Sequence, residues 1–167
     1  MSEFFIKAFN TIMAFIHWGV LKLVPRSHPI LGEVANPIVF GSQQGIYWLA
    51  QKMFKLMKDK RGIGLAGPQC GVPLRIFVMY IERNRYVCIN PEILDTYGPK
   101  EVDREGCLSF PGEEYMVPRY PKIEVRYQTT TGKFMTEVME GIKARCFQHE
   151  LDHLNGITFH KRSTYNY

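Results

Sequence analysis

The stretch QHELDH, residues 148–153, is the most informative part of this sequence for its fold and function, because it holds the pattern HExxH within a segment of helical periodicity. Residues four apart lie on one face of a helix, so His149 and His153 can reach one metal ion. Glu150 follows the first histidine and can act as base toward a water molecule beside that metal. The stretch predicts a metal site on a helix, and the alternative is two histidines and a glutamate on a solvated face.

HExxH supplies two ligands, and the third has to be found elsewhere. One group of metalloproteases uses HExxHxxGxxH, but the last position of that pattern is Phe159 here, and His160 is one residue too far along. Another group takes a glutamate well downstream, and no glutamate follows Glu150. Both completions fail, so we expect the third ligand upstream of the helix.

The stretch EGCLS, residues 105–109, supplies the upstream candidate. A Cys107 thiolate beside two neutral imidazoles makes a tetrahedral site with one open position, and Gly106 allows close backbone approach. The alternative is that Cys107 is a small buried hydrophobe, as most free cysteines are. Cys146 precedes His149 by less than one helical turn, so it can line the same pocket, although a core position is the simpler interpretation. The weaker candidates are Cys70, Cys88 and Cys146.

A glycine-rich stretch, GIGLAGPQ at residues 62–69, is the third element. It lacks GxxxxGK[ST], and no helix-starting pattern follows, so a phosphate site is excluded. The glycines instead let a substrate backbone come close. Gln69 can then donate an amide N–H to a developing oxyanion. The alternative is a plain turn with an exposed glutamine.

The rest of the pattern predicts the α+β class. A helix is expected at 46–60 and a final helix at 142–154, ended by Gly156. Strand-like runs lie at 75–81, 86–89, 123–127 and 134–139. No regular βαβ alternation is present, so we expect small mixed or antiparallel sheets packed around a central C-terminal helix that carries HExxH.

Length and composition indicate one catalytic domain, residues 18–167, of ordinary globular character. The net charge of +5 predicts a solvated basic surface, with an anionic partner such as RNA as the alternative. Four cysteines without a CxxC pair favour a reducing compartment.

Residues 1–17 are predicted to form a helical extension of the domain. Phe5, Phe9, Ile12 and Ile16 recur at helical spacing, while intervening polar residues make a poor transmembrane span. No secretory signal pattern is present. We expect the extension to pack on the domain, and a helix that contacts a membrane surface or a partner is the less favoured alternative.

GIGLAGPQ, EGCLS and QHELDH, in this order, resemble the three signature motifs of the peptide deformylase family, roughly GxGxAAxQ, EGCLS and QHExDH. The resemblance covers about residues 20–160. It implies metal-dependent removal of the N-formyl group from the initiator methionine of newly made polypeptides. It also implies one divalent metal ion, Fe²⁺ in the family, replaceable by Zn²⁺, Ni²⁺ or Co²⁺.

The resemblance also implies roles for residues at matching motif positions. The implied metal ligands are Cys107, His149 and His153. Glu150 is the implied base and then acid, and the implied oxyanion donors are Gln69 and the backbone N–H of Leu108. The implied substrate contacts are Ile63, Gly64 and Gly106, the last beside the methionine pocket.

Two departures from the family pattern bear on these expectations. Gly67 stands where the family usually has a second alanine, and we expect the lost methyl to loosen the loop. The sequence ends at Tyr167, without the further C-terminal helix that docks many bacterial members on the ribosome. We therefore expect a formylmethionyl peptide as partner, ribosome proximity without that helix, and no specific nucleic acid.

The resemblance leaves the location and three alternative functions open. The expected location is the cytoplasm of a bacterium or phage host, or an organelle. The alternatives to an ordinary deformylase are a deformylase of altered substrate range, an HExxH metallopeptidase and a non-catalytic binding relative.

Overall fold

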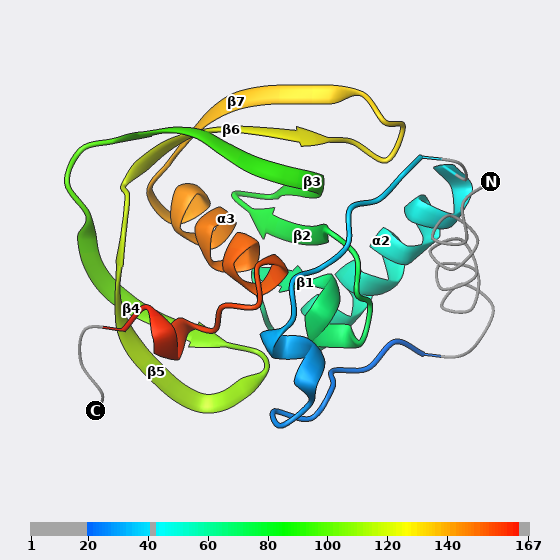
Figure 1. The fold of residues 1–167 in the computed structure, drawn as a ribbon, viewed down its shortest axis with the longest axis horizontal. Helices are drawn as coiled ribbons and strands as arrows, with labels where there is room; N and C mark the ends of the chain where they lie inside the picture. Colours follow the sequence, from blue (N-terminus) through cyan, green and yellow to red (C-terminus); the bar gives the residue numbers. More distant parts are fainter. Residues whose placement is uncertain (1–19, 41–42, 164–167) are drawn as a thin grey trace.

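The computed structural model describes residues 20–40 and 43–163 (Figure 1). The predicted helical extension, residues 1–17, lies outside the described residues. Within the described ranges, no helix has the length and apolar character needed to span a membrane.

Two antiparallel sheets form the framework. The larger has the order β1-β2-β3-β6-β7, and the smaller is the hairpin β4-β5. The larger sheet comprises β1 (Gly64–Ala66), β2 (Ile76–Ile81), β3 (Asn84–Tyr97), β6 (Lys122–Gln128) and β7 (Phe134–Glu140). The hairpin comprises β4 (Glu101–Cys107) and β5 (Phe110–Arg119). Every pairing between these strands is antiparallel, which confirms the predicted α+β class.

The predicted strands are present, but three others were missed. β1 lies inside the stretch that we expected to be a glycine-rich loop, and it is followed by a 3-10 helix, η2 (Gly67–Cys70). β4 has charged residues on most of its exposed positions, and β5 begins with Phe-Pro-Gly followed by two glutamates, so both lack the apolar alternation that identifies a strand. β3 extends well beyond the predicted 86–89, because register shifts after Ile89 let it bend and continue beside β6.

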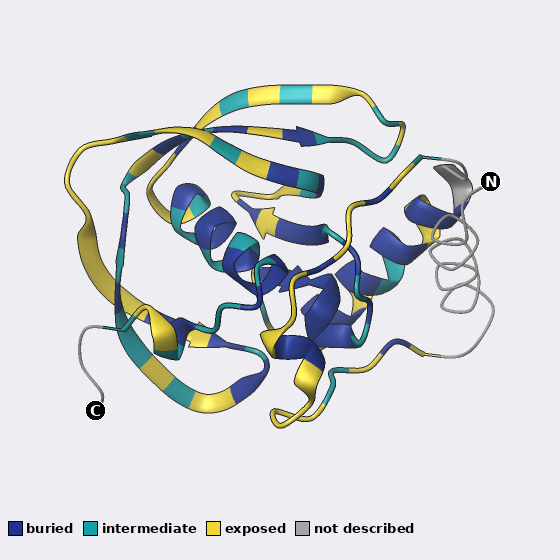
Figure 2. Ribbon diagram, in the orientation of Figure 1, coloured by how far each residue is buried: buried dark blue, intermediate teal, exposed yellow. Residues whose placement is uncertain are grey.

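Two helices pack against the larger sheet, α2 (Gln43–Asp59) and α3 (Gly141–Leu154). α2 buries Leu49 and Met53 against the side of the sheet that holds Leu65 and Val78. Figure 1 shows α3 between the larger sheet and the hairpin, and Figure 2 shows it as mostly buried. α3 includes QHELDH, residues 148–153.

The predicted end of α3 is confirmed by its geometry. Gly156 has φ of +67°, the left-handed conformation that ends many helices. A β-carbon there would lie 2.5 Å from the carbonyl oxygen of Gly32, so a side chain would also collide with the entry segment. That segment includes the 3-10 helix η1 (Pro29–Gly32), and Ala35 N–H donates to the Leu154 carbonyl at 2.9 Å. A third 3-10 helix, η3 (Phe159–Lys161), follows α3.

Candidate metal centre and active-site pocket

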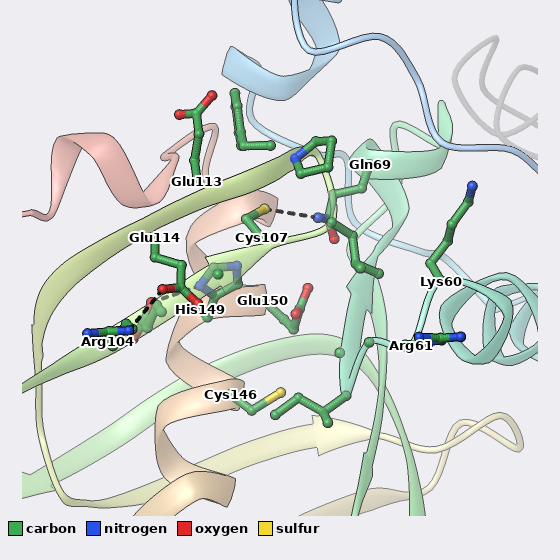
Figure 3. A pocket seen from close by; sticks show the side chains of 18 of the residues that line it. Lys60, Arg61, Gln69, Arg104, Cys107, Glu113, Glu114, Cys146, His149 and Glu150 are labelled. Carbon is green, nitrogen blue, oxygen red and sulfur yellow. Dashed lines mark hydrogen bonds and ion pairs between the residues drawn. The ribbon is translucent and has the colours of Figure 1, made fainter. Parts of the chain in front are cut away.

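One pocket lies between α3, the hairpin and the start of β1 (Figure 3). All three signature stretches contribute to its lining: residues 62–64 and Gln69, residues 105–108, and two residues of α3, His149 and Glu150. The fold therefore brings together segments that are far apart in the sequence.

Cys107, His149 and His153 form the candidate metal centre. Their ligand atoms all lie within 4.8 Å of one another. The two histidines are one helical turn apart on α3, and their ring centroids are 5.0 Å apart. Cys107 ends β4, and its Sγ lies 3.2 Å from His153 Nε2. Within the parts of the chain that the structure describes, this is the one cluster with such geometry.

Two buried polar atoms at this centre have no hydrogen-bond partner within the described residues, Glu150 Oε2 and His153 Nδ1. Buried polar groups are nearly always satisfied, so an unpartnered Glu150 oxygen beside the ligand cluster fits a site that takes a polar partner. A thiolate and two imidazoles suit a tetrahedral ion with an open coordination position. The residues present therefore fit a divalent metal and a polar molecule beside it.

Glu105 contacts the candidate ligand His149 on the side of the ring opposite the metal centre. Its Oε2 lies 2.8 Å from His149 Nδ1, which leaves the other ring nitrogen free to face the metal. Arg119 binds both carboxylate oxygens at 3.0 Å, and Arg145 donates to Oε1 at 2.9 Å. Burial alone would raise the pKa of Glu105, but its bonds to His149 and Arg119 outweigh burial and lower that pKa to about 2.

Asp152 connects Arg119 to α3. Arg119 also donates to Asp152, and Arg162 binds the two Asp152 oxygens at 3.1 and 2.8 Å. The hairpin that carries Cys107 is thus joined to the helix that carries both histidines through buried charges. These supporting residues were missed by the sequence reasoning, although Glu105 and Asp152 lie inside the quoted motifs.

The two imidazoles differ in their surroundings. Burial lowers the pKa of His153 well below its usual range, and the neighbouring His149 lowers it further. Burial also disfavours protonation of His149, but hydrogen bonds with Cys107 and Glu105 outweigh it and raise the pKa to about 10. A neutral His153 is ready to act as a ligand.

Glu150 has the surroundings of an acid/base residue. Its side chain is buried, and this burial raises its pKa to about 7 although His149 acts in the opposite direction. A general acid or base works best when its pKa lies near the working pH. Gly64 makes room for it, because a β-carbon at Gly64 would lie 2.2 Å from Glu150 Oε1.

Gln69 is buried, so the alternative of an exposed turn glutamine is wrong. Its Oε1 accepts from Ala66 N–H at 2.8 Å, which fixes which end of the amide faces the pocket. Its Nε2 lies 3.4 Å from Cys107 Sγ (Figure 3) and 3.2 Å from Ser109 Oγ. The amide donor therefore points at the candidate metal centre.

Gly67 lies against closely packed backbone. A β-carbon there would lie 2.8 Å from the Val72 carbonyl oxygen and 2.9 Å from that of Leu74. The missing methyl thus coincides with close backbone packing beneath the turn that carries Gln69. An alanine would require the segment around Val72 to shift.

The remaining predicted residues also reach the pocket. Ile63 is exposed at the beginning of β1, and Gly106 precedes Cys107 on β4 with an open face. Leu108 lies in the turn between β4 and β5 and covers Gly62, where a β-carbon would meet Leu108 Cδ1 at 2.6 Å. Cys146 is both a core residue and a pocket residue, so both interpretations of it hold.

Comparison with known proteins supports these observations. The chain matches the family described as Polypeptide deformylase over residues 20–166. A peptide deformylase of Thermotoga petrophila is 43% identical over 129 residues, which cover 77% of this chain and 78% of that protein. One from Desulforudis audaxviator is 42% identical over 147 residues, covering 87% and 95% respectively.

Solved structures show the same likeness. The crystal structure of peptide deformylase from Thermotoga maritima has a TM-score of 0.85 and 36% identity, and the match covers 89% of this chain and 100% of that chain. The Met-Ala-Ser-bound class I type b peptide deformylase from Acinetobacter baumannii has a TM-score of 0.80 and 35% identity, covering 86% and 98%.

Fold, pocket and comparisons together define a hydrolytic enzyme with a possible metal centre. The match extends through all three signature stretches rather than the helix alone. The chain belongs to the polypeptide deformylase family.

Proposed function

We propose that this chain is a metal-dependent peptide deformylase that removes the N-formyl group from the initiator methionine of newly made polypeptides. The observation that carries the proposal is that the cluster of Cys107, His149 and His153 borders a pocket whose lining includes Cys107, His149, Glu150 and Gln69. The family membership of the chain supports the same reaction.

The proposed substrate position follows from β1, which is an edge strand. β1 pairs with β2 on one side, and the pocket borders its beginning at Ile63 and Gly64. An exposed strand edge can bind an extended peptide by main-chain hydrogen bonds. The carbonyl of Ile63 already accepts from Tyr80 N–H at 2.8 Å, so it is used within the protein. We therefore assign the substrate contacts to the other backbone groups of Ile63 and Gly64, those that face the pocket.

The direction of the bound peptide follows from the position of the candidate metal centre relative to β1. Gln69, whose Nε2 lies 3.4 Å from Cys107 Sγ, follows the end of β1, whereas residues 60–62 precede its start. A peptide with its formyl group at the metal centre would therefore run antiparallel to β1. The methionine side chain would enter the part of the pocket lined by Gly106, Ile142 and Cys146.

The proposed chemistry is hydrolysis of the formyl amide. Bound at Cys107, His149 and His153, a divalent ion supplies Lewis acidity and lowers the pKa of water. Glu150 takes a proton from the attacking water and returns it to the leaving amine nitrogen. Gln69 Nε2 and the Leu108 backbone N–H donate hydrogen bonds to the oxyanion that develops on the formyl oxygen.

We propose Fe²⁺ as the native metal, with Zn²⁺, Ni²⁺ or Co²⁺ as functional replacements. One thiolate and two imidazoles suit each of these ions, so the ligand set supports the class of metal rather than one member. The proposed place of action is the cytoplasm, near the ribosome where formylated chains are made.

Formate release from formyl-Met-Ala-Ser by protein purified without oxygen tests the proposal. We expect turnover that a chelator abolishes and that added Fe²⁺ restores. Acetyl-Met-Ala-Ser is the matched control, because a site narrow enough for a formyl group should exclude the larger acyl group. Casein cleavage without formate release would instead support the metallopeptidase alternative. Metal-loaded protein that neither releases formate nor cleaves casein would refute both.

A further inference from the structure

We propose that Lys60 and Arg61 make this enzyme selective for formylated peptides that carry an acidic side chain within the first few residues after the methionine. The inference rests on the proposed function, because it follows the peptide outward from the metal centre. It concerns the mouth of the pocket, where the two basic side chains form part of the lining. Figure 3 shows them at the end of α2, on the other side of the pocket from Arg104 and Glu114.

The direction of the peptide brings it to these residues. An extended chain advances about 3.3 Å per residue. Gly64 packs directly against the Glu150 side chain. Arg61 and Lys60 are three and four residues before Gly64 in the chain. A peptide that runs antiparallel to β1 from the metal centre therefore passes Arg61 and Lys60 with roughly its second to fourth residues.

The charges at the mouth are not balanced. Glu113 is already paired with Arg26 at 2.7 Å and with His160 at 2.9 Å. Glu114 is paired with Arg104 at 3.2 Å. Across residues 20–40 and 43–163, no carboxylate lies within ion-pair distance of Lys60 or Arg61. The charges that remain available to a ligand are therefore the two positive ones.

The backbone holds Arg61 in place at a conformational cost. α2 ends in a Schellman arrangement, in which Gly62 N–H donates to Met57 O and Arg61 N–H donates to Lys58 O, both at 2.9 Å. Arg61 occupies the left-handed position of this motif with φ of +59°, where glycine is the usual residue. A long cationic side chain is thus kept at a position that favours glycine, directly before the substrate-binding edge.

Another explanation for the two charges is favourable interaction with the negative end of the helix dipole of α2. Lys58 provides the control, because it lies in the last turn of the same helix but does not line the pocket. If the dipole alone accounts for the basic residues, replacing Lys58 should have the same consequences as replacing Lys60. If the pocket accounts for them, the two replacements should differ.

The test compares amidated peptides, so that no terminal carboxylate contributes. The peptides are formyl-Met-Ala-Glu-NH2, formyl-Met-Ala-Lys-NH2 and formyl-Met-Ala-Ser-NH2. Each peptide is also tested in a form that is one residue longer. We expect kcat/KM to favour the glutamate peptide over the lysine peptide by about 3–10-fold at low salt, from two exposed charges of ordinary strength. The preference should fall toward unity near 1 M salt, where the screening length is about 3 Å.

The variants are the double substitution Lys60→Gln/Arg61→Asn and the control Lys58→Gln. Asparagine tolerates the left-handed conformation, so the end of α2 is kept. The double variant should bring the glutamate-to-lysine ratio to within about twofold of one, while Lys58→Gln keeps it. A ratio near one in the unmodified enzyme, or an unchanged ratio in the double variant, overturns the inference alone. Absence of formate from every peptide overturns the proposed function and this inference with it.

Discussion

Replacement of Glu105 by glutamine tests the buried charge network that supports the metal centre. The substitution keeps the size of the side chain but removes the charge that Arg119, Arg145 and His149 share. One amide group cannot accept from all three, and its NH₂ would face a guanidinium. Arg119 would then keep only Asp152 as an acidic partner, in a buried position.

The size of the effect follows from the pKa of Glu105, which lies near 2 instead of its usual 4.5. Since one pKa unit corresponds to about 1.4 kcal/mol, the surroundings favour the charged form by about 3 kcal/mol. Breaking a buried ion pair by removing one partner typically costs about 3–5 kcal/mol. We therefore expect Glu105→Gln to lower the free energy of unfolding by about 3 kcal/mol, and metal affinity by about 10–100-fold.

The assay is urea unfolding of metal-loaded and metal-free protein, with metal affinity measured by competition with a chelator. Glu114→Gln is the matched control, since it removes one partner of an exposed ion pair with Arg104 and should cost less than about 1 kcal/mol. Equal stability of the two variants, or unchanged metal affinity in Glu105→Gln, would refute the supporting role of the network.

Four further expectations concern the centre and the extension. Cys107→Ala should lose the metal, measured by elemental analysis; full occupancy with normal activity would contradict the ligand assignment. Glu150→Gln should keep the metal and lose about 10²–10⁴-fold in kcat, and a loss of only a few fold would exclude it as the base. Gly64→Ala should reduce activity and cost about 1–3 kcal/mol in urea unfolding, because its β-carbon would displace Glu150; wild-type values for both would show that the contact relaxes freely. Deleting residues 2–16 should lower the melting temperature in detergent-free buffer while catalysis is kept, and loss of liposome binding alone would show a membrane anchor instead.

The elements with a clear apolar period were predictable from the sequence. α2 and α3 repeat large apolar residues every three to four positions, and β6 alternates buried and exposed residues. β4 was not predictable in this way, because five of its seven residues are exposed and charges dominate it. It is held by pairing with β5 and by the buried Glu105, neither of which leaves a local pattern.

The candidate site was predictable where spacing or chemistry restricts the choice. HExxH fixes two ligands through helical geometry, and failure of the downstream completions directs attention upstream to Cys107. The roles of Arg119 and Arg162 had no comparable signal, since their partners Glu105 and Asp152 lie 14 and 10 residues away and belong to no helical or motif spacing. The close packing at Gly67 was not predictable, because the carbonyls that approach it belong to residues 72 and 74, where the chain turns back, and glycine content alone does not reveal that turn.

The hairpin β4-β5 belongs to a separate sheet from the rest of the framework, yet it supplies Cys107 to a centre whose other candidate ligands lie on α3. An ion held there would act as a cross-link between segments 46 residues apart in sequence, closing a loop much as a disulfide does. The affinity for the metal and the local stability of the hairpin would then be thermodynamically linked. Amide hydrogen exchange in β4 should slow when metal is bound, and the hairpin should be the first part of the domain to open when it is withdrawn.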